Sequence, residues 1–302
     1  MSNILEVKNL KKSFGHQCII GDLSFEVGNQ EIVGFLGPNG SGKSTTLKCI
    51  VGLYHPTKGD IRIGGYSTEK NRKEALTLVG QSIENPTLFP NLTGRDHLKM
   101  MARWRGVEDK RVMEMVEFSG LGHHIDKNAG NYSMGMKMRL MLSLVLLHRP
   151  KLVILDEPTN GLDPQAVFKL REEMQQIRDE GSSILFSSHQ LGEVEKIADR
   201  IILINHGDKI YDGILPEHLR QGSIYEILVS DLELALPLFN KTQGIHLASS
   251  DIDKKGWITF TCDNEYALSQ IMMNLQKKDI QILDFNREDP NLESFYKSYY
   301  KE

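Results

Sequence analysis

The 302-residue sequence contains few cysteines and no long apolar run. Its three cysteines, Cys18, Cys49 and Cys262, are far apart and odd in number, which argues against a disulfide framework or a metal knuckle and for a reducing compartment. The longest apolar stretch, 140–147, is far shorter than the roughly 18 residues of a membrane-spanning helix, and residues 1–12 lack the apolar core of a signal peptide. We therefore expect a cytosolic protein that meets a membrane only through a partner.

An excess of one charge is also missing. The chain has 36 Lys and Arg against 40 Asp and Glu, for a formal net charge of -4. A general nucleic-acid binder, or a protein held on an anionic membrane, needs a basic excess, so we expect neither here. The length allows one large domain or two modest ones.

The most informative stretch is 37–45, which reads Gly-Pro-Asn-Gly-Ser-Gly-Lys-Ser-Thr. It follows the apolar run 32–36 and precedes an apolar-periodic segment, so it joins a buried strand to a helix, the context of a phosphate-binding P-loop. Glycines here let successive backbone N–H groups point at an anion held at the helix N-terminus. The predicted nucleotide-binding residues are Gly37, Pro38, Asn39, Gly40, Ser41, Gly42, Lys43, Ser44 and Thr45.

Three side chains of this loop have specific expected contacts. Lys43 is expected to reach the β- and γ-phosphates and to take part in catalysis. Ser44 is expected to place its hydroxyl on Mg²⁺, and Thr45 to lie close to the α-phosphate. A chance glycine-rich turn is the alternative, and the strand before it and the helix after it argue against that interpretation.

Residues 151–158 read as a buried parallel strand that ends in two carboxylates and a proline. Ligands of α/β sheets bind at the carboxyl ends of the strands. Asp156 is therefore expected to hold Mg²⁺ through water, and Glu157 to accept a proton from an attacking water. The alternative is two surface acids at a strand end.

A second strand, 182–187, ends in Ser188 and His189 and follows a helix at 164–180. His189 is expected to contact the γ-phosphate and the attacking water. An isolated histidine is more often structural, but two strands with polar ends on one edge of the sheet favour the functional interpretation.

Residues 4–36 predict alternating strands, and Phe14 lies in the turn after the first of them. Its ring is a candidate to stack on a purine. A lone phenylalanine more often belongs to the core.

A helix-rich region at 92–148 opens at the N-cap candidate Thr93. Near its end, Ser133 and Gly135 stand where a long apolar helix, 138–147, begins. A serine hydroxyl together with the exposed N–H groups of a helix forms a second anion site. A serine N-cap is also the ordinary start of any helix. This segment therefore indicates an anion site only in combination with the motifs that follow it.

Together, these motifs resemble those of the ATP-binding-cassette (ABC) ATPases over about residues 1–220. The matching segments are Walker A at 37–45, the signature at 133–137, Walker B at 152–156 followed by Glu157, the D-loop at 161–163 and the switch histidine His189. A generic P-loop kinase or GTPase would leave the signature and the switch histidine unexplained.

The resemblance implies an α/β P-loop fold, with a mixed sheet core and antiparallel β and α-helical subdomains, and it implies ATP and Mg²⁺ as ligands. Two cassettes would face head to tail, as a homodimer or a pseudo-symmetric heterodimer. Each ATP would lie between the P-loop of one subunit and the Ser133, Gly135 and Asp163 side of the other. A separate transmembrane permease would dock at the helical region between Glu84 and about Arg105 and hold the dimer on the inner face of the cell membrane.

The lid position requires a choice between two residues. Gln81 resembles the family's Q-loop glutamine, but alignment on 88–93 places Glu84 there, and Glu84 is then expected to bind the Mg²⁺ shell. A glutamate at this position resembles the branch of bacitracin-resistance and lantibiotic-immunity ATPases. The signature segment Tyr-Ser-Met-Gly-Met-Lys and the Walker B continuation Glu-Pro-Thr-Asn-Gly-Leu-Asp resemble the same branch. A carboxylate adds charge beside the γ-phosphate, so coupling through the lid would differ from that of a glutamine.

Three positions depart from the family pattern. Met134 stands where glycine is frequent, and Met136 replaces the common glutamine, so the contacts of that glutamine are lost. Phe14 replaces the more frequent tyrosine of the adenine-stacking turn, which keeps the ring and loses a hydroxyl.

The pattern changes at about residue 223, which predicts an ABC domain at 1–222 and an accessory domain at 223–302. The second part alternates short strands and amphipathic helices in the order βαββαβ, as in a small α+β ferredoxin-like domain. A last helix is expected at 291–300, with an aromatic stripe more typical of packed core than of a binding face. The segment 289–295 is similar to the tail of drug- and antibiotic-exporting cassette subunits. The sequence leaves two alternative roles for this domain, regulation of the ATPase and support of the dimer.

We expect the ATP-hydrolysing subunit of an exporter, with antibiotic or peptide efflux or immunity as the expectation for its branch. The alternative is a soluble ABC ATPase that acts on ribosomes or DNA. Chromosome-type cassettes carry a long coiled coil before the signature, and no sustained heptads occur here. Ribosome-acting relatives usually carry two cassettes and a basic linker. This chain has a single cassette and a slight excess of acidic residues, which favours a transporter subunit. No nucleic acid is therefore expected as a partner.

Overall fold

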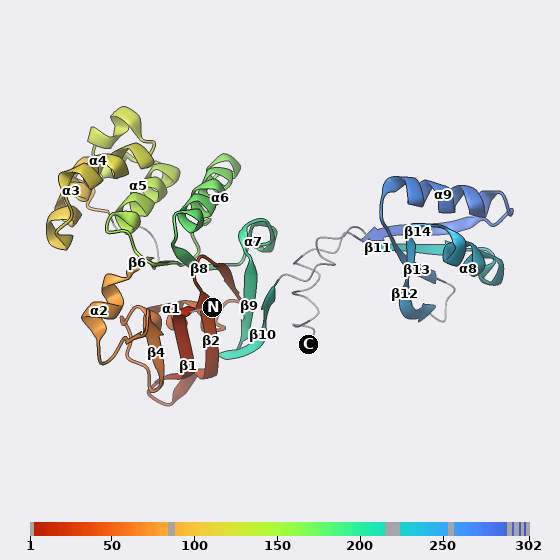
Figure 1. Ribbon diagram of the computed structural model, residues 1–302, viewed down its shortest axis with the longest axis horizontal. Coiled ribbons are helices and arrows are strands. Elements are labelled where there is room, and N and C mark those ends of the chain that lie inside the picture. The colour runs from red at the N-terminus through yellow and green to blue at the C-terminus, as the bar shows by residue number, and fades with distance from the viewer. Residues whose placement is uncertain are drawn as a thin grey trace. The chain divides into compact units, whose positions relative to one another are not determined.

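The computed structural model describes residues 3–83, 88–214, 224–252 and 257–288, together with Leu292, Tyr296 and Tyr299. The chain forms two compact units, Met1–Ile214 and Leu215–Glu302, which are described separately (Figure 1). The expected division between residues 222 and 223 lies outside the described residues.

A ten-stranded sheet organises the first unit, in the order β5-β4-β1-β2-β10-β9-β3-β8-β7-β6. Its strands are β1 (Asn3–Phe14), β2 (Gln17–Gly28), β3 (Ile32–Leu36), β4 (Lys58–Ile63), β5 (Tyr66–Ser67), β6 (Val79–Ser82), β7 (Leu152–Leu155), β8 (Ser183–Ser188), β9 (Arg200–Asn205) and β10 (Asp208–Ile214). Its helices are α1 (Lys43–Ile50), α2 (Arg72–Thr77), α3 (Gly94–Arg105), α4 (Asp109–Phe118), α5 (Met134–Leu146), α6 (Pro164–Asp179) and α7 (Leu191–Ile197), with short 3-10 turns at Gly122–Asp126 and Ala129–Asn131.

The strands β9, β3, β8, β7 and β6 run parallel, and β1, β2, β4 and β5 form an antiparallel region beside them. Every residue of β3 and β7 is buried, because a parallel sheet is covered on both faces and its strands are apolar throughout. The predicted α/β class, with a mixed sheet and an antiparallel β region, is confirmed.

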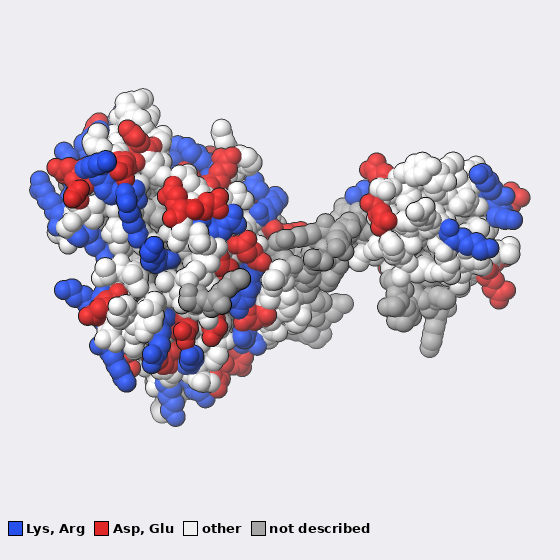
Figure 2. All heavy atoms as spheres, viewed as in Figure 1, with Lys and Arg blue, Asp and Glu red and all other residues white. Residues whose placement is uncertain are grey.

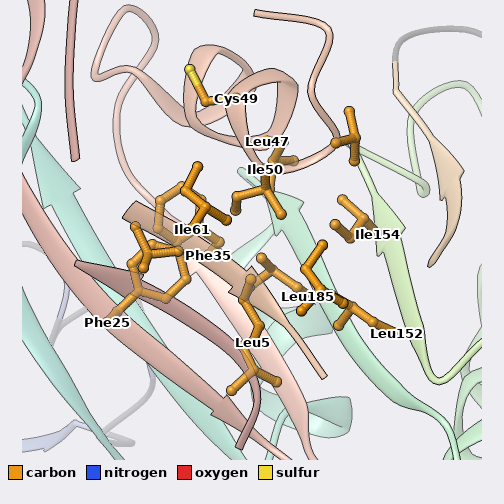
Figure 3. Close-up of a cluster of buried hydrophobic side chains, with 14 of the residues drawn as sticks. Leu5, Phe25, Phe35, Leu47, Cys49, Ile50, Ile61, Leu152, Ile154 and Leu185 are labelled. Atoms are coloured by element: carbon orange, nitrogen blue, oxygen red, sulfur yellow. The ribbon is translucent and has the colours of Figure 1, made fainter. Parts of the chain in front are cut away.

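The helix that follows the P-loop is anchored in the main core (Figure 3). Leu47 and Ile50 of α1 are fully buried and belong to the same cluster as Phe35 of β3, Ile154 of β7 and Leu185 of β8. Burying a side chain of this size contributes about 1.5–3 kcal/mol, so the cluster fixes α1 against the sheet.

The helices α3, α4 and α5 form a separate group at one side of the sheet (Figure 1). Thr93 is the N-cap of α3, as predicted, and forms a capping box with Asp96. The helix α5 begins at Met134, four residues before the predicted start, because the Ser133 hydroxyl accepts from the Met136 N–H and caps the helix directly.

Sequence analysis missed α2 and β6. The strand β6 has the sequence Val-Gly-Gln-Ser and pairs in parallel with β7 from Val79↔Leu152 to Ser82↔Leu155. Only Val79 has strong β-propensity, so the pairing with a buried strand makes this segment a strand.

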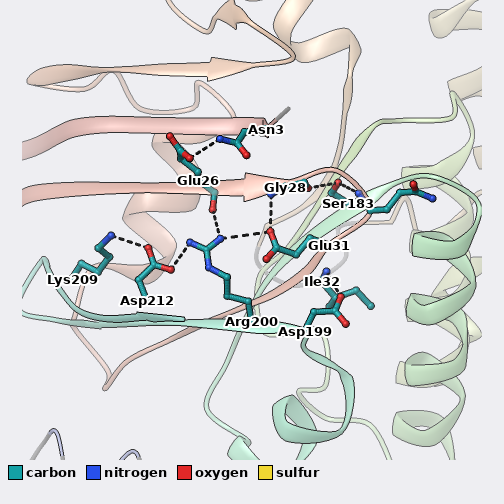
Figure 4. A network of polar contacts seen from close by, with 11 residues as sticks. Asn3, Glu26, Gly28, Glu31, Ile32, Ser183, Asp199, Arg200, Lys209 and Asp212 are labelled. Carbon is teal, nitrogen blue, oxygen red and sulfur yellow. Dashed lines mark hydrogen bonds and ion pairs between the residues drawn. The ribbon is translucent and has the colours of Figure 1, made fainter. Parts of the chain in front are cut away.

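The amino-terminal edge of the parallel strands is closed by a polar network (Figure 4). The guanidinium of Arg200 donates to the Glu26 carbonyl at 3.0 Å and forms ion pairs with Asp212 and with Glu31. Asp199 accepts from the Ile32 N–H at 2.9 Å. These charges satisfy one another. Elsewhere on the face shown in Figure 2, acidic and basic side chains of the first unit are interspersed, as the balanced composition implies.

The second unit is a four-stranded antiparallel sheet in the order β12-β13-β11-β14, with two helices. Its elements are β11 (Ile224–Val229), α8 (Leu232–Lys241), β12 (Ile245–Ile252), β13 (Trp257–Cys262), α9 (Glu265–Gln276) and β14 (Ile282–Glu288). The order βαββαβ is the predicted one. Its own apolar core includes Phe239, Phe260 and Ile271. The expected helix at 291–300 lies mostly outside the described residues.

Candidate nucleotide-binding site

Three predicted motifs lie at one edge of the sheet, because they follow three neighbouring parallel strands. The P-loop follows β3, Asp156 and Glu157 follow β7, and His189 follows β8. The strand β8 lies between the other two, with Leu36 opposite Ser188 and Leu155 opposite Phe186. The carboxyl ends of these strands therefore bring the three motifs together.

The P-loop backbone has the conformation that its glycines allow. Gly40 and Gly42 have φ angles of 82° and 102°, in the left-handed region that favours glycine. A side chain at Gly37 would collide with the Ile204 carbonyl and the Ser41 hydroxyl. Gly42 is the N-cap of α1 and supplies no side-chain cap, so the first N–H groups of the helix are available to an anion.

Lys43 is 7% exposed, and its ammonium group donates to the carbonyl oxygens of Gly37 at 2.7 Å and Pro38 at 3.2 Å. Burial lowers the pKa of Lys43, while the carboxylates of Glu157 and Asp156 act in the opposite direction. The loop therefore holds a buried cation that faces the two acids that follow β7.

The two acids have different partners. Asp156 accepts a hydrogen bond from the Ser187 hydroxyl at 2.5 Å, and the same hydroxyl oxygen accepts from the Glu157 N–H at 2.9 Å. The Glu157 carboxylate lies 2.7 Å from Nδ1 of His189. Glu157 is half-buried and His189 is exposed. The arrangement suits a carboxylate that accepts a proton from water at the edge of the sheet.

Glu157 also has an unusual backbone. Its φ angle is 50°, in the left-handed region that residues with a side chain rarely adopt. Such a conformation costs of order 1–3 kcal/mol and is typical of functional sites.

The signature residues form a second group. Ser133 caps α5, and Asp163 caps α6 by accepting from the Ala166 N–H at 2.8 Å. A Cβ at Gly135 would lie 3.6 Å from that of Ala166, so the N-termini of α5 and α6 are neighbours. Among the described residues, no hydrogen bond or ion pair joins Ser133 or Asp163 to the group around Lys43.

Of the two remaining candidate residues, the structure describes Phe14. Phe14, at the end of β1, is 45% exposed, and its ring packs edge to face on Tyr54 with centroids 5.2 Å apart. The ammonium group of Lys12 lies 4.5 Å from the Phe14 centroid. The ring is thus partly accessible and is not a core residue. Glu84 lies outside the described residues.

Sequence analysis missed Ser187, which links Asp156 to the backbone of Glu157. The sequence pattern places it only as the last residue of the strand 182–187. The sequence carries only part of the signal, a hydroxyl at the end of one strand and acids after another, because their pairing depends on the strand order.

The residues present fit a polyphosphate and a hard divalent cation. Ser41 Oγ is buried and has no hydrogen-bond partner among the described residues, and Lys43 is a buried cation. The loop has no room for a side chain at Gly37. Ser44, in the first turn of α1, and Asp156 carry oxygen donors of the kind that Mg²⁺ prefers and would be the residues to hold it.

A family model, curated relatives and solved structures were compared with this chain, and all three comparisons point to the same family. A family model described as ABC transporter matches residues 20–160. The chain is 38% identical over 256 residues to the uncharacterized ABC transporter ATP-binding protein YhcH of Bacillus subtilis, covering 82% of this chain and 84% of that protein. It is 32% identical to the bacitracin transport ATP-binding protein BcrA of Enterococcus faecalis, covering 98% and 96%. A solved structure titled as the ATP binding subunit of an ABC transporter matches with a TM-score of 0.66 and 33% identity, covering 72% of this chain and 92% of that one.

Proposed function

This chain belongs to the ABC transporter family, and on that premise we propose that it is the subunit that hydrolyses ATP to drive export through a separate permease. The observation that carries the proposal is the convergence of the buried Lys43, the two acids of β7 and His189 at one edge of the sheet. Binding and cleavage of a nucleoside triphosphate need a cationic phosphate cradle and a base beside it.

Each residue has one role in the proposed reaction. The P-loop N–H groups and Lys43 hold the β- and γ-phosphates, and Glu157 accepts the proton of the attacking water. His189 keeps the Glu157 carboxylate in place through its contact at 2.7 Å. Ser44 and Asp156 would hold Mg²⁺, which when bound supplies positive charge to the phosphate oxygens. Positioning and charge stabilisation account for most of the rate enhancement in phosphoryl transfer.

We place Ser133, Gly135 and Asp163 in the same reaction through a second cassette. In one chain these residues have no polar contact with the Lys43 group among the described residues, and Ser133 is exposed at the start of α5. A head-to-tail dimer would set the signature end of one subunit over the P-loop of the other. A hydroxyl and the N-terminus of α5 would then face the γ-phosphate.

The permease is proposed to dock beside α3 in a groove of about 320 Å³ that Leu53, Leu88, Met101 and Met141 help to line. Among the described residues, no helix is both long and apolar enough to cross a membrane. Binding to this membrane partner would hold the subunit on the inner face of the cell membrane. The relative named for bacitracin transport covers nearly the whole chain, which supports a peptide antibiotic as the cargo.

A Glu157→Gln variant tests the function, because the amide keeps the size of the side chain and loses its basicity. With Mg-ATP, the variant is expected to elute as a dimer on size exclusion and to lose hydrolysis. The Lys43→Ala variant is the control and is expected to stay monomeric. A Glu157→Gln protein that stays monomeric with its permease present and hydrolyses ATP at the parental rate would refute the proposal.

The cargo is tested in cells. Co-expression of the chain with its permease is expected to raise resistance to bacitracin, and the Glu157→Gln variant is expected to remove that gain. Unchanged resistance, together with normal ATP hydrolysis, would reject the cargo and leave the ATPase assignment intact.

A further inference from the structure

The short helix α7 directly follows the residue that contacts the proposed base. It begins at Leu191, two residues after His189, and its N-cap Gln190 makes no side-chain hydrogen bond to the helix. At seven residues, α7 is too short to be stable by itself in water, so its contacts with the rest of the unit hold it in place. His189 lies between Ser188, the last residue of β8, and this helix. The direction of its imidazole therefore depends on how α7 packs.

Apolar packing anchors one side of α7 on the sheet. Val194 is fully buried and Ile197 is 5% exposed. A Cβ at Gly34 of β3 would lie 2.6 Å from Cγ1 of Val194, so this valine packs directly on the strand before the P-loop. Apolar burial has no preferred direction, so this contact alone leaves the helix able to turn about Val194. A polar contact elsewhere on α7 can fix that rotation.

Such a contact is an ion pair between α7 and its neighbour α6 (Figure 1). Arg171 Nε lies 3.4 Å from Glu193 Oε2, and the two side chains are 21% and 22% exposed. Both atoms are buried, and neither has a hydrogen-bond partner among the described residues. The other oxygen of Glu193 pairs with Lys196 of the same helix, whose side chain is exposed. Loss of Arg171 would therefore leave a buried carboxylate oxygen without its counter-charge.

The guanidinium of Arg171 is also restrained on its own helix. Its central carbon lies 5.2 Å from the centroid of the Phe168 ring, one turn earlier in α6. A guanidinium held over an aromatic ring is stabilised by the ring electrons and keeps less rotational freedom. The ion pair with Glu193 therefore joins α7 to a restrained group and not to a freely moving side chain.

The ion pair and the contact at the base join the same two segments at two points. One segment runs from Glu157 through α6 to Arg171, and the other runs from His189 into α7. At one end, Glu157 Oε2 lies 2.7 Å from Nδ1 of His189. At the other end, Arg171 lies 3.4 Å from Glu193. Two segments joined at two points resist a rotation that either contact alone would allow.

We propose that Arg171 and Glu193 are positioning residues for ATP hydrolysis. Their ion pair holds α7 where the imidazole of His189 meets the Glu157 carboxylate. The inference rests on the proposed function and adds two residues that act on the base through α7, without belonging to any of the nucleotide-binding motifs. Loss of the pair would let α7 turn and would loosen the base, so hydrolysis would slow while nucleotide binding would change little.

The first experiment removes the pair from either side in the full chain. Arg171→Met keeps an unbranched side chain without the charge, and Glu193→Gln keeps the size of the carboxylate. Each is expected to lower kcat for ATP hydrolysis by about tenfold and to change KM by less than about twofold. Arg178→Met is the control, because it also removes ion pairs from α6 but its partners, Asp179 and Asp199, lie outside α7. Parental kcat in both pair variants, or an equal fall in the control, would contradict the proposal.

The second experiment is a double-mutant cycle that asks whether the pair acts through His189. It compares kcat and urea unfolding for the parental chain, Arg171→Met, His189→Ala and the double variant. Once the imidazole is absent, Arg171→Met is expected to lower kcat by less than about twofold, while its effect on the unfolding midpoint stays the same. A tenfold loss of kcat in both backgrounds would show a structural role alone and would overturn the proposal.

The third experiment exchanges the two charges. Arg171→Glu or Glu193→Arg alone places like charges together, and each is expected to lower kcat by about tenfold or more. The double exchange restores opposite charges and is expected to return kcat to within about threefold of the parental value. A folded double variant as slow as the single variants would contradict the pair.

The proposed function and the positioning pair fail in different ways. If Glu157→Gln hydrolyses ATP at the parental rate, the function itself is wrong. If Glu157→Gln abolishes hydrolysis while Arg171→Met and Glu193→Gln keep the parental kcat, only the positioning role of the pair is wrong.

Discussion

Glu157 Oε2 lies 2.7 Å from Nδ1 of His189 and 3.3 Å from the backbone nitrogen of the same residue. The two residues follow different strands, β7 and β8, so the register of the sheet sets their distance. A carboxylate held twice by one residue has little rotational freedom, which is what a base aimed at a single water requires.

Loss of His189 should therefore disorder the base. We expect His189→Ala to lower kcat for ATP hydrolysis by about 100-fold while KM changes little, since general-base positioning contributes on this scale. Steady-state phosphate release measures both constants. His123→Ala, at an exposed histidine of the 3-10 turn Gly122–Asp126, is the control and should be silent. Retention of the parental kcat would show that the contact is incidental.

Ser187 should position both acids of β7. Ser187→Ala removes one hydrogen bond from Asp156 and one from the Glu157 N–H, so we expect lower kcat and a stability loss of about 1–3 kcal/mol. Ser188→Ala is the matched control. Ser188 is as buried, but its hydroxyl accepts from the Gln190 N–H and touches neither acid. Hydrolysis and denaturant unfolding measured on both variants separate the two effects.

Ser133 should have one role in folding and another in turnover. Ser133→Ala and Thr93→Ala each delete an N-cap and should each cost about 1 kcal/mol in unfolding experiments. Only Ser133→Ala is expected to weaken the ATP-bound dimer of the Glu157→Gln protein, as measured by light scattering. If both variants weakened the dimer equally, the effect would be one of helix stability alone.

Glu173 should make stability depend on pH. It is 8% exposed on α6, and burial raises its pKa from 4.5 to about 7. The folded state then binds the proton more tightly than the unfolded state, so stability is full below pH 4.5 and is lost as the pH rises through 7. Glu173→Gln keeps the neutral form and should gain up to about 3 kcal/mol at pH 8 with little change at pH 4.5.

The matched control for Glu173→Gln is Glu172→Gln, at the exposed neighbouring position. Urea unfolding of both variants at pH 4.5 and pH 8 gives the comparison. A Glu173→Gln gain that was equal at the two pH values would rule out titration of this carboxyl as its cause.

Motifs whose residues are local could be read from the sequence. The P-loop and the acids after β7 depend on a strand followed by a turn. The strand β3 has the predicted bounds, 32–36, and β7 is shorter than the predicted strand, at 152–155 within 151–158. The sequence also identified both N-caps, Thr93 and Ser133, because a cap depends on three or four consecutive residues.

Features that depend on another strand could not be read in the same way. The strand β6 exists through its pairing with β7, so Gln81 lies in a strand that the residues around it do not specify. The contact between Ser187 and Asp156 crosses from β8 to β7 and becomes visible only once the strand order is known. The groove beside α3 combines four distant segments of the chain and has no local signature.

The separate apolar cores of the two units have a calorimetric consequence. A chain with two such cores need not melt in a single cooperative event, because the loss of one cluster leaves the other intact. Heating scans should resolve two endotherms, of which only the first unit's is expected to move when ATP is added. One melting temperature would describe neither unit.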